Sequence, residues 1–160
     1  MPRSSARQPG FTLVELLLVM GLVAVLAGIT SVNLFSPQTK ANINSLTDRL
    51  AADIKSQQIK AMSGDSMSAS AAQEHGVYIQ TGTYTLFKGT AYSGADTDNI
   101  PIASEGGVTL STTFPSTQVV FDKGSGEVIG FTNGSNTITL SGSGETKTIT
   151  INRYGAVTVN

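Results

Sequence analysis

The residues near the N-terminus that could take part in chemistry are Gly10, Phe11 and Glu15. Phe11 begins a run of 19 residues, ending at Ile29, in which only Thr12 and Glu15 are neither apolar nor small. A carboxylate inside a membrane helix costs about 2.5–3.5 kcal/mol, so such acids usually have a partner. Cleavage of the Gly10–Phe11 bond would free a cationic α-amino group four residues before Glu15 on one helix face. We therefore predict that the Glu15 carboxylate neutralises an α-amine, on its own chain or on a packed neighbour.

Three interpretations compete for this apolar run. As a helix it would be about 28 Å long, close to the thickness of a bilayer core. It could be an uncleaved signal anchor, a secretory signal peptide cut near residues 25–27, or the helix that follows a leader removed before Phe11. Only the last interpretation gives Glu15 a function. Arg3 and Arg7 precede the run, so we expect the N-terminal end to face the cytoplasm.

Residues 10–15 (GFTLVE), followed by the apolar run, resemble the N-terminus of type IV pilins and type II secretion pseudopilins. The resemblance implies cleavage after Gly10 by a prepilin peptidase and N-methylation of Phe11. It also implies that Glu15 pairs with the amino terminus of an adjacent subunit. The implied partners are other pilin or pseudopilin subunits, the prepilin peptidase, an inner-membrane assembly platform and membrane lipid. Pro9 departs from the family, in which a basic residue often precedes the glycine.

The elements that must carry this motif divide the chain into three parts. We expect a leader at 1–10, a transmembrane and assembly helix at 11–35, and a globular domain at 36–160. Pro37 is predicted to kink or interrupt the helix. From 41 to 62 an amphipathic helix is predicted from apolar residues spaced by about 3.6 positions, namely Ile43, Leu46, Leu50, Ile54 and Met62. We expect Gly64 to end it.

The remainder, 76–160, has the composition of antiparallel strands separated by turns. A first hairpin is predicted from 77–79 and 83–87 around Gly82, and a last one from 145–153 and 156–159. Further strands are expected at 108–110, 118–121, 127–131 and 137–140, while 88–107 is predicted to be a long irregular loop. The fold class is therefore α+β: a long N-terminal helix, half membrane segment and half amphipathic, packed on an antiparallel β-sheet.

Two stretches of this domain add a finer resemblance. Residues 119–127 (VVFDKGSGE) and 148–157 (TITINRYGAV) are similar to the minor pseudopilins related to the type II secretion H component and the FimT-type pilins. Many relatives have Gly-Arg near the C-terminus, whereas here Gly155 precedes Ala156.

Catalytic constellations are not apparent in the sequence. The chain has no cysteine and one histidine, His75, which excludes thiolate and multi-histidine metal sites. We expect His75 to be an ordinary loop residue, the chain not to be an enzyme, and no cofactor to be bound. The oxygen-bearing residues Asp96, Asp98 and Asn99 form a weak candidate for calcium, without the full twelve-residue loop and its closing glutamate.

The charge and aromatic patterns also exclude some classes of binding partner. The net charge is −1, and loss of Arg3 and Arg7 with the leader would leave eight basic against 11 acidic side chains. Nucleic acid is therefore not expected as a partner. We expect Tyr78, Tyr84, Phe87 and Phe121 to be core residues rather than a stacking platform.

Taken together, these features predict a structural minor pilin or pseudopilin subunit. The precursor is expected to be a single-pass protein of the inner membrane with its globular domain outside the cytoplasm. After processing it would join a cell-surface or periplasmic filament. A pilus, a secretion pseudopilus and a DNA-uptake machine all stay open, as do tip and shaft positions. The alternative is a membrane-tethered binding module, an adhesin or DNA-uptake receptor, that uses the loop 88–107 and does not polymerise.

Overall fold

The computed structural model describes residues 10–30, 35–64, 72–142 and 144–160, and the side chains of 28–30 and 35–39 are not considered. The chain divides into two compact units, residues 1–34 and 35–160. The first contains helix α1, Leu13–Thr30. Leucine, valine and alanine fill this helix, and it contains no proline, so nothing interrupts its hydrogen-bond ladder.

The second unit begins with helix α2, Phe35–Ser63. Of the two effects predicted for Pro37, the interruption of a helix is wrong, because α2 begins two residues earlier and continues through it, while the kink stays a prediction. In the first turn of a helix a backbone N–H has no intrahelical partner, so proline is tolerated there. Gly64 ends the helix as predicted, in a left-handed conformation (φ 69°) that glycine adopts without strain.

The buried face of α2 is the predicted one for four of its five residues. Ile43, Leu46, Leu50 and Ile54 are buried, whereas Met62 is exposed, so its assignment to the core is wrong. At 100° per residue, Ala61 rather than Met62 returns to the face of Ile54, and Ala61 is fully buried.

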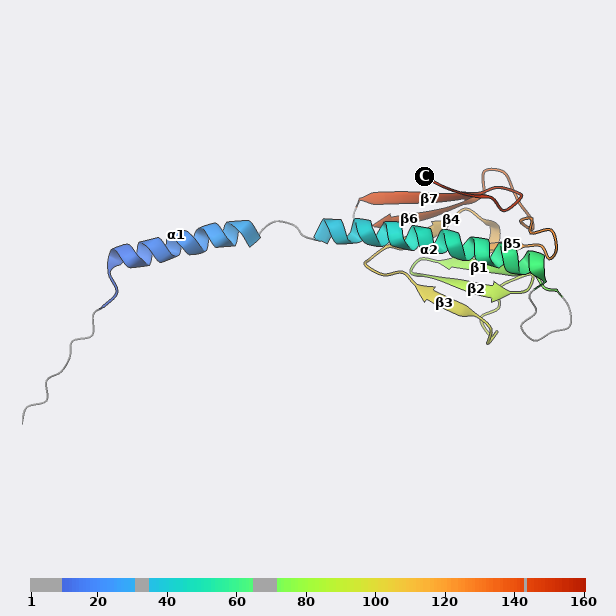
Figure 1. Ribbon diagram of the computed structural model, residues 1–160, viewed down its shortest axis with the longest axis horizontal. Helices are drawn as coiled ribbons and strands as arrows, with labels where there is room; N and C mark the ends of the chain where they lie inside the picture. Colours follow the sequence, from blue (N-terminus) through green and yellow to red (C-terminus); the bar gives the residue numbers. More distant parts are fainter. Residues whose placement is uncertain (1–9, 31–34, 65–71, 143) are drawn as a thin grey trace, which may run out of the picture. The chain divides into compact units, whose positions relative to one another are not determined.

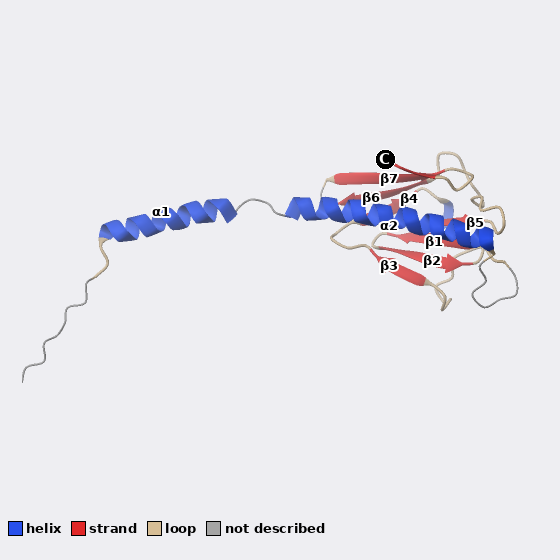
Figure 2. Ribbon diagram, viewed as in Figure 1, coloured by secondary structure: helices blue, strands red, loops and turns tan. Residues whose placement is uncertain are grey.

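Eight strands form two four-stranded antiparallel sheets beside α2 (Figure 1, Figure 2). The first sheet has the order β3-β2-β1-β5, with β1 at His75–Gln80, β2 at Thr83–Lys88, β3 at Ile100–Ala103 and β5 at Gln118–Phe121. The second has the order β4-β6-β7-β8, with β4 at Thr109–Thr112, β6 at Thr137–Gly142, β7 at Glu145–Ile151 and β8 at Val157–Val159. A 3₁₀ turn at Pro115–Thr117 precedes β5. The predicted α+β class is confirmed.

Two strand predictions need correction. The segment 88–107 is not irregular throughout, because β3 pairs with the free side of β2 and buries Ile102. Residues 127–131 do not form a strand; Val128 makes a single bridge to Phe121. Gly126, just before this segment, and Gly130, within it, have φ of 69° and 66°, values that turn the chain out of an extended path.

The core lies between α2 and the two sheets. It is built from the buried apolar residues of both sheets and α2, and Tyr84 and Phe121 are among its largest members. The Tyr84 hydroxyl donates a hydrogen bond of 2.6 Å to Asp53 Oδ2, which ties β2 to α2. The aromatic prediction is confirmed for Tyr84, Phe87 and Phe121. Tyr78 is half-buried and stacks on Tyr92 with ring centroids 4.0 Å apart.

Candidate functional site

Helix α1 begins with a capping box formed by Thr12 and Glu15. The Glu15 backbone N–H donates to Thr12 Oγ1 at 3.3 Å, and the Thr12 backbone N–H donates to Glu15 Oε2 at 3.4 Å. The two side chains also meet directly, with Thr12 Oγ1 donating to the same carboxylate oxygen at 3.2 Å. This reciprocal arrangement satisfies backbone donors that the first turn of a helix leaves unpaired, and it fixes where α1 starts.

The sequence itself contains a local signal for this cap. Thr-x-x-Glu before an apolar run is the usual pattern of a capping box. The sequence prediction gave Glu15 only an α-amine as its partner. In the unprocessed chain, however, its carboxylate already accepts a hydrogen bond from the Thr12 backbone N–H. The carboxylate therefore lies at the amide of residue 12, one residue from the nitrogen that cleavage at Gly10 would free.

The Gly10–Phe11 peptide bond precedes the helix and is accessible. Gly10 and Phe11 have no regular secondary structure, and the Phe11 side chain is 80% exposed. A β-carbon placed on Gly10 would meet no atom within 4 Å. A protease needs an unhindered substrate outside regular secondary structure, and Gly10 and Phe11 meet that need.

Helix α1 exposes apolar side chains on every side. Every described side chain from Leu13 to Ala27 is exposed, and Glu15 is the only charged one among them. Each exposed leucine or valine would gain about 1.5–3 kcal/mol on burial. A helix that is apolar all round is stable only when lipid or protein covers it. Among the residues that the structure describes, no helix combines the length and apolar character needed to cross a membrane.

The calcium candidates lie together in the loop before β3. One oxygen of each aspartate already has a partner, whereas Asn99 Oδ1 is buried without a hydrogen-bond partner in the described part of the chain. Lys88 Nζ lies 2.6 Å from Asp98 Oδ2, and the backbone N–H of Asp98 donates to Asp96 Oδ1 at 3.0 Å. The Asn99 amide donates to the carbonyl of Ser93 at 2.7 Å. The hydrogen bond that Lys88 donates to Asp98 raises the pKa of Lys88. A lysine ammonium therefore stands where a cation would bind Asp98.

His75 is not the loop residue that the sequence predicts. It is the first residue of β1 and is buried, because β2 and β5 pair with it on both sides. It lines a small hollow with Gln57, Lys60 and Lys88. Sequence reasoning missed this placement because one histidine before a short strand carries no periodicity.

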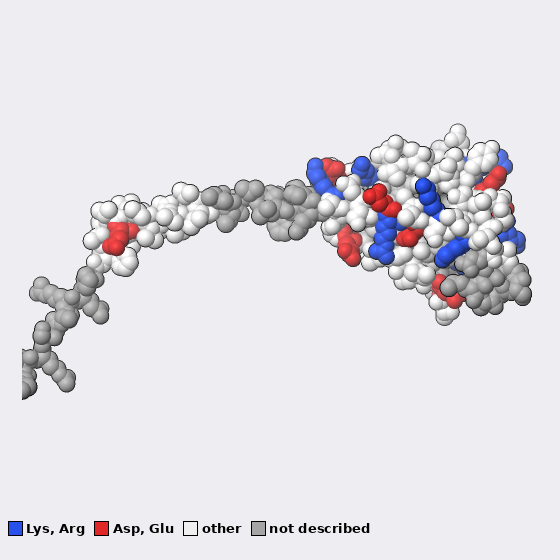
Figure 3. All heavy atoms as spheres, in the orientation of Figure 1, with Lys and Arg blue, Asp and Glu red and all other residues white. Residues whose placement is uncertain are grey.

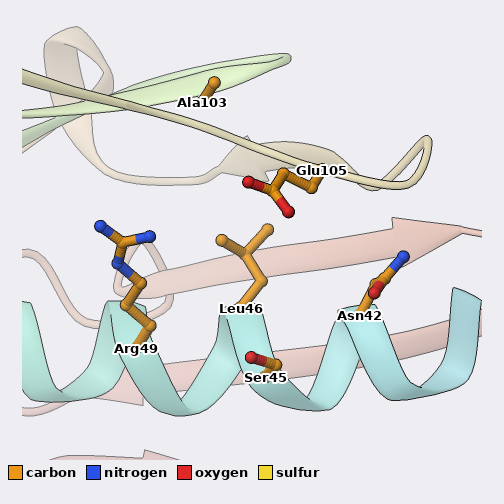
Figure 4. A pocket seen from close by; sticks show the side chains of 6 residues that line it. All are labelled: Asn42, Ser45, Leu46, Arg49, Ala103 and Glu105. Atoms are coloured by element: carbon orange, nitrogen blue, oxygen red, sulfur yellow. The ribbon is translucent and has the colours of Figure 1, made fainter.

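A second hollow, of about 90 Å³, lies between α2 and the chain after β3 (Figure 4). Arg49 projects into it from α2, and Glu105 approaches from the opposite side. Asn42, Ser45, Leu46 and Ala103 complete the lining. Its size and exposed charged groups suit solvent or a single small polar group, and nothing in the sequence pattern pointed to it.

Basic side chains do not gather into one patch on the face shown in Figure 3, where both signs of charge are interspersed. Four basic residues of the described chain are paired with carboxylates: Lys40 with Glu145, Lys88 with Asp98, Lys123 with Glu74, and Arg153 with Glu127. Paired charges are poor ligands for a polyanion, because each phosphate contact would have to displace a carboxylate.

Comparisons with known proteins bear on the N-terminal segment alone. A family model for the prokaryotic N-terminal methylation motif matches residues 5–31. Neither the comparison with curated proteins nor that with solved structures found a match. The matched range contains Gly10, Phe11, the capping box and α1. The chain therefore carries a type IV pilin-like signal, which supports a membrane-anchored precursor that is a substrate of prepilin peptidase.

Proposed function

We propose that this chain is a minor pilin or pseudopilin subunit that is cleaved between Gly10 and Phe11, N-methylated on Phe11, and assembled into a filament. The observation that carries the proposal is the methylation motif at 5–31, which contains an exposed, non-helical Gly10–Phe11 bond and a helix whose only charged residue is Glu15. A prepilin peptidase would remove the leader 1–10. The minor-subunit assignment rests on the resemblance of residues 119–127 and 148–157.

Glu15 gains a second role once the leader is removed. Its carboxylate already accepts a hydrogen bond from the Thr12 backbone N–H at 3.4 Å. The new α-amino group on Phe11 would be cationic at neutral pH. In a packed bundle of such helices, pairing between this amine and a neighbour's Glu15 would neutralise both buried charges. Breaking such a pair typically costs 3–5 kcal/mol, enough to reject a subunit that is out of register.

The apolar surface of α1 would be covered in two successive environments. In the precursor it would lie in the inner membrane, with Arg3 and Arg7 on the cytoplasmic side and the unit 35–160 outside the cytoplasm. In the filament the helices of neighbouring subunits would cover it. The inner-membrane assembly platform would transfer the subunit from one environment to the other.

The proposed role is structural rather than enzymatic. The strongest features of the chain are a peptidase target, an apolar helix and a domain in which four basic side chains are paired with carboxylates. The alternative, a membrane-tethered binding module that does not polymerise, differs in one respect: it has no need of the Glu15 charge.

The decisive variant is Glu15→Gln in the native host. Glutamine also serves at this position of a capping box, so α1 should start at the same residue, while the charge is lost. We expect the E15Q chain to be processed and retained in the membrane but absent from sheared filaments. The matched control is Thr12→Val, which disturbs the cap and leaves the charge, and should still be incorporated. Normal incorporation of E15Q would refute the proposed role of the Glu15 charge in assembly. Absence of the parent chain itself from sheared filaments would refute the filament proposal and favour the tethered module.

A further inference from the structure

The two sheets leave a hollow between the end of β1 and the edge strand β4. It is open to solvent, has a volume of about 420 Å³, and is lined along one side by residues 78–81 and along the other by 110–112. Thr117 closes a third side. None of the lining residues is charged. The hollow lies outside the N-terminal site and away from the residues considered for calcium.

On the β1 side, two residues extend beyond their partner strand. β2 pairs with β1 along its whole length, but the pairing with β5 ends at Tyr78 opposite Gln118. Ser116 and Thr117 adopt φ of 54° and 53°, which turns the chain away before it could continue β5 backwards. In an antiparallel ladder the hydrogen-bonding groups of successive residues point to alternate sides. Gln80 closes the hairpin with Thr83, so the N–H and C=O of Ile79 point into the hollow.

On the β4 side, the strand is an edge of its sheet and pairs only with β6 in the part of the chain that is described. The backbone N–H of Leu110 points away from β6 and donates to the carbonyl of Thr81 at 2.8 Å. By the same alternation, the Leu110 carbonyl and the Thr112 N–H face the hollow. The backbone N–H of the next residue, Thr113, points toward β6 again and donates to the Thr137 carbonyl. The Thr81–Leu110 bond therefore closes one end of a wedge whose two sides are open strand edges.

We propose that this wedge binds an uncharged peptide segment in extended conformation, by addition of a strand between β1 and β4. Backbone donors and acceptors on both sides are the feature that recognises another backbone, and strand addition uses them for affinity. Residues 78–81 span about 13 Å at 3.3 Å per residue, so three to four residues of the partner fit. The uncharged lining and its hydroxyl and aliphatic groups select small polar and β-branched side chains. Leaving these backbone groups unpaired keeps the edge available for a partner.

The test uses the full chain in detergent and the blocked, uncharged peptide Ac-TVTV-NH₂ as probe. Amide hydrogen exchange at Ile79 and Thr112 is read by mass spectrometry over seconds, because unpaired amides exchange fast. At a peptide concentration about five times Kd, exchange at both amides should slow about sixfold. The same peptide with its amide nitrogens methylated cannot donate and should give no slowing.

Two variants of Thr112 distinguish the contribution of its backbone N–H to peptide binding from that of its side chain. Thr112→Pro removes the N–H that faces the hollow, on an edge strand where proline is tolerated. Thr112→Val keeps that N–H. Like Thr112→Pro, it removes the Thr112 hydroxyl, which donates to the Thr137 carbonyl and accepts from the Phe114 backbone N–H. Both variants are first checked by tyrosine near-ultraviolet circular dichroism. We expect T112V to bind as the parent does and T112P to bind about tenfold more weakly, the effect of one lost hydrogen bond.

Three outcomes overturn the proposal. They are no slowing at Ile79 and Thr112 at saturating peptide, equal binding by T112P and T112V, and slowing by the neutral sugar maltotetraose while the peptide has no effect. The last outcome would assign the hollow to a glycan. None of these results depends on cleavage at Gly10, so the proposed filament role is tested separately.

Discussion

The hydrogen bond between Tyr84 and Asp53 is predicted to make a measurable contribution to the stability of the unit 35–160. Tyr84 is fully buried, and its hydroxyl lies 2.6 Å from the Asp53 carboxylate. Hydrogen bonds to charged groups contribute about 1.5–3 kcal/mol net. Tyr84→Phe removes this bond without changing the shape of the ring. The free energy of unfolding should therefore fall by about 2 kcal/mol.

The same bond predicts a pH dependence. Burial, followed by the hydrogen bond to Asp53, raises the pKa of Tyr84 well above its ordinary value of 10.0. Above pH 10 the folded protein therefore keeps a proton that the unfolded chain has lost. The unfolding free energy should decrease as pH rises from there, because the folded state binds more protons. Tyr84→Phe removes this component of the slope.

The assay is urea unfolding of the full chain in detergent, followed by tyrosine near-ultraviolet circular dichroism. All four tyrosines lie in the unit 35–160, so the signal reports this unit alone. The matched control is Tyr154→Phe, since Tyr154 is 69% exposed. The reasoning is refuted if Y84F and Y154F unfold at the same urea concentration, or if Y84F keeps the parent's loss of stability above pH 10.

Three further predictions use the same assays. Gly126→Ala should destabilise the unit more than Gly124→Ala. Both glycines have positive φ, but a β-carbon on Gly126 would lie 2.6 Å from Met62 Cγ, whereas a β-carbon on Gly124 would meet nothing within 4 Å. Equal midpoints for the two variants would contradict this contact, whose cost we put at about 1 kcal/mol beyond the shared strain. Thr12→Ala should speed amide exchange in the first turn of α1 several-fold in detergent, because loss of an N-cap costs about 0.5–2 kcal/mol; unchanged exchange would show that the cap does not hold the helix start. Millimolar calcium should leave the urea midpoint unchanged, because Lys88 already neutralises Asp98, and a higher midpoint would restore the loop as a calcium site.

The sequence predicted those features that follow from periodicity or from a strong local pattern. Four of the five residues assigned to the buried face of α2, and the first and last hairpins, were predicted correctly because burial repeats every 3.6 or two residues. The end of α2 was correct because glycine adopts the left-handed conformation without strain. β3 was missed because four residues containing a proline carry no alternation, and its pairing depends on an edge of β2 that only the folded chain provides. Met62 was wrongly assigned to the buried face of α2, because it follows the buried Ala61 by one residue and each residue of a helix turns the side chain by 100°.

At the candidate site, the cost of a buried acid led us to predict roles for Gly10, Phe11 and Glu15, and these roles stay predictions. The sequence prediction did not give Glu15 its hydrogen bonds, since the Thr-x-x-Glu pattern was overlooked. His75 and the hollow between β1 and β4 depend on contacts between strands far apart in the chain. Such contacts leave no mark on local residue spacing, so they could be found only from the structure.

The most direct test of the central claim is the intact mass and N-terminal sequence of the membrane-extracted protein from its native host. We expect a chain that begins with N-methylated Phe11 and is about 1.1 kDa lighter than the precursor, the mass of a ten-residue leader. A chain that begins at Met1 would contradict processing and leave an ordinary anchor. A chain that begins at Gly28 would mean a secreted domain without α1, and the filament role would be abandoned.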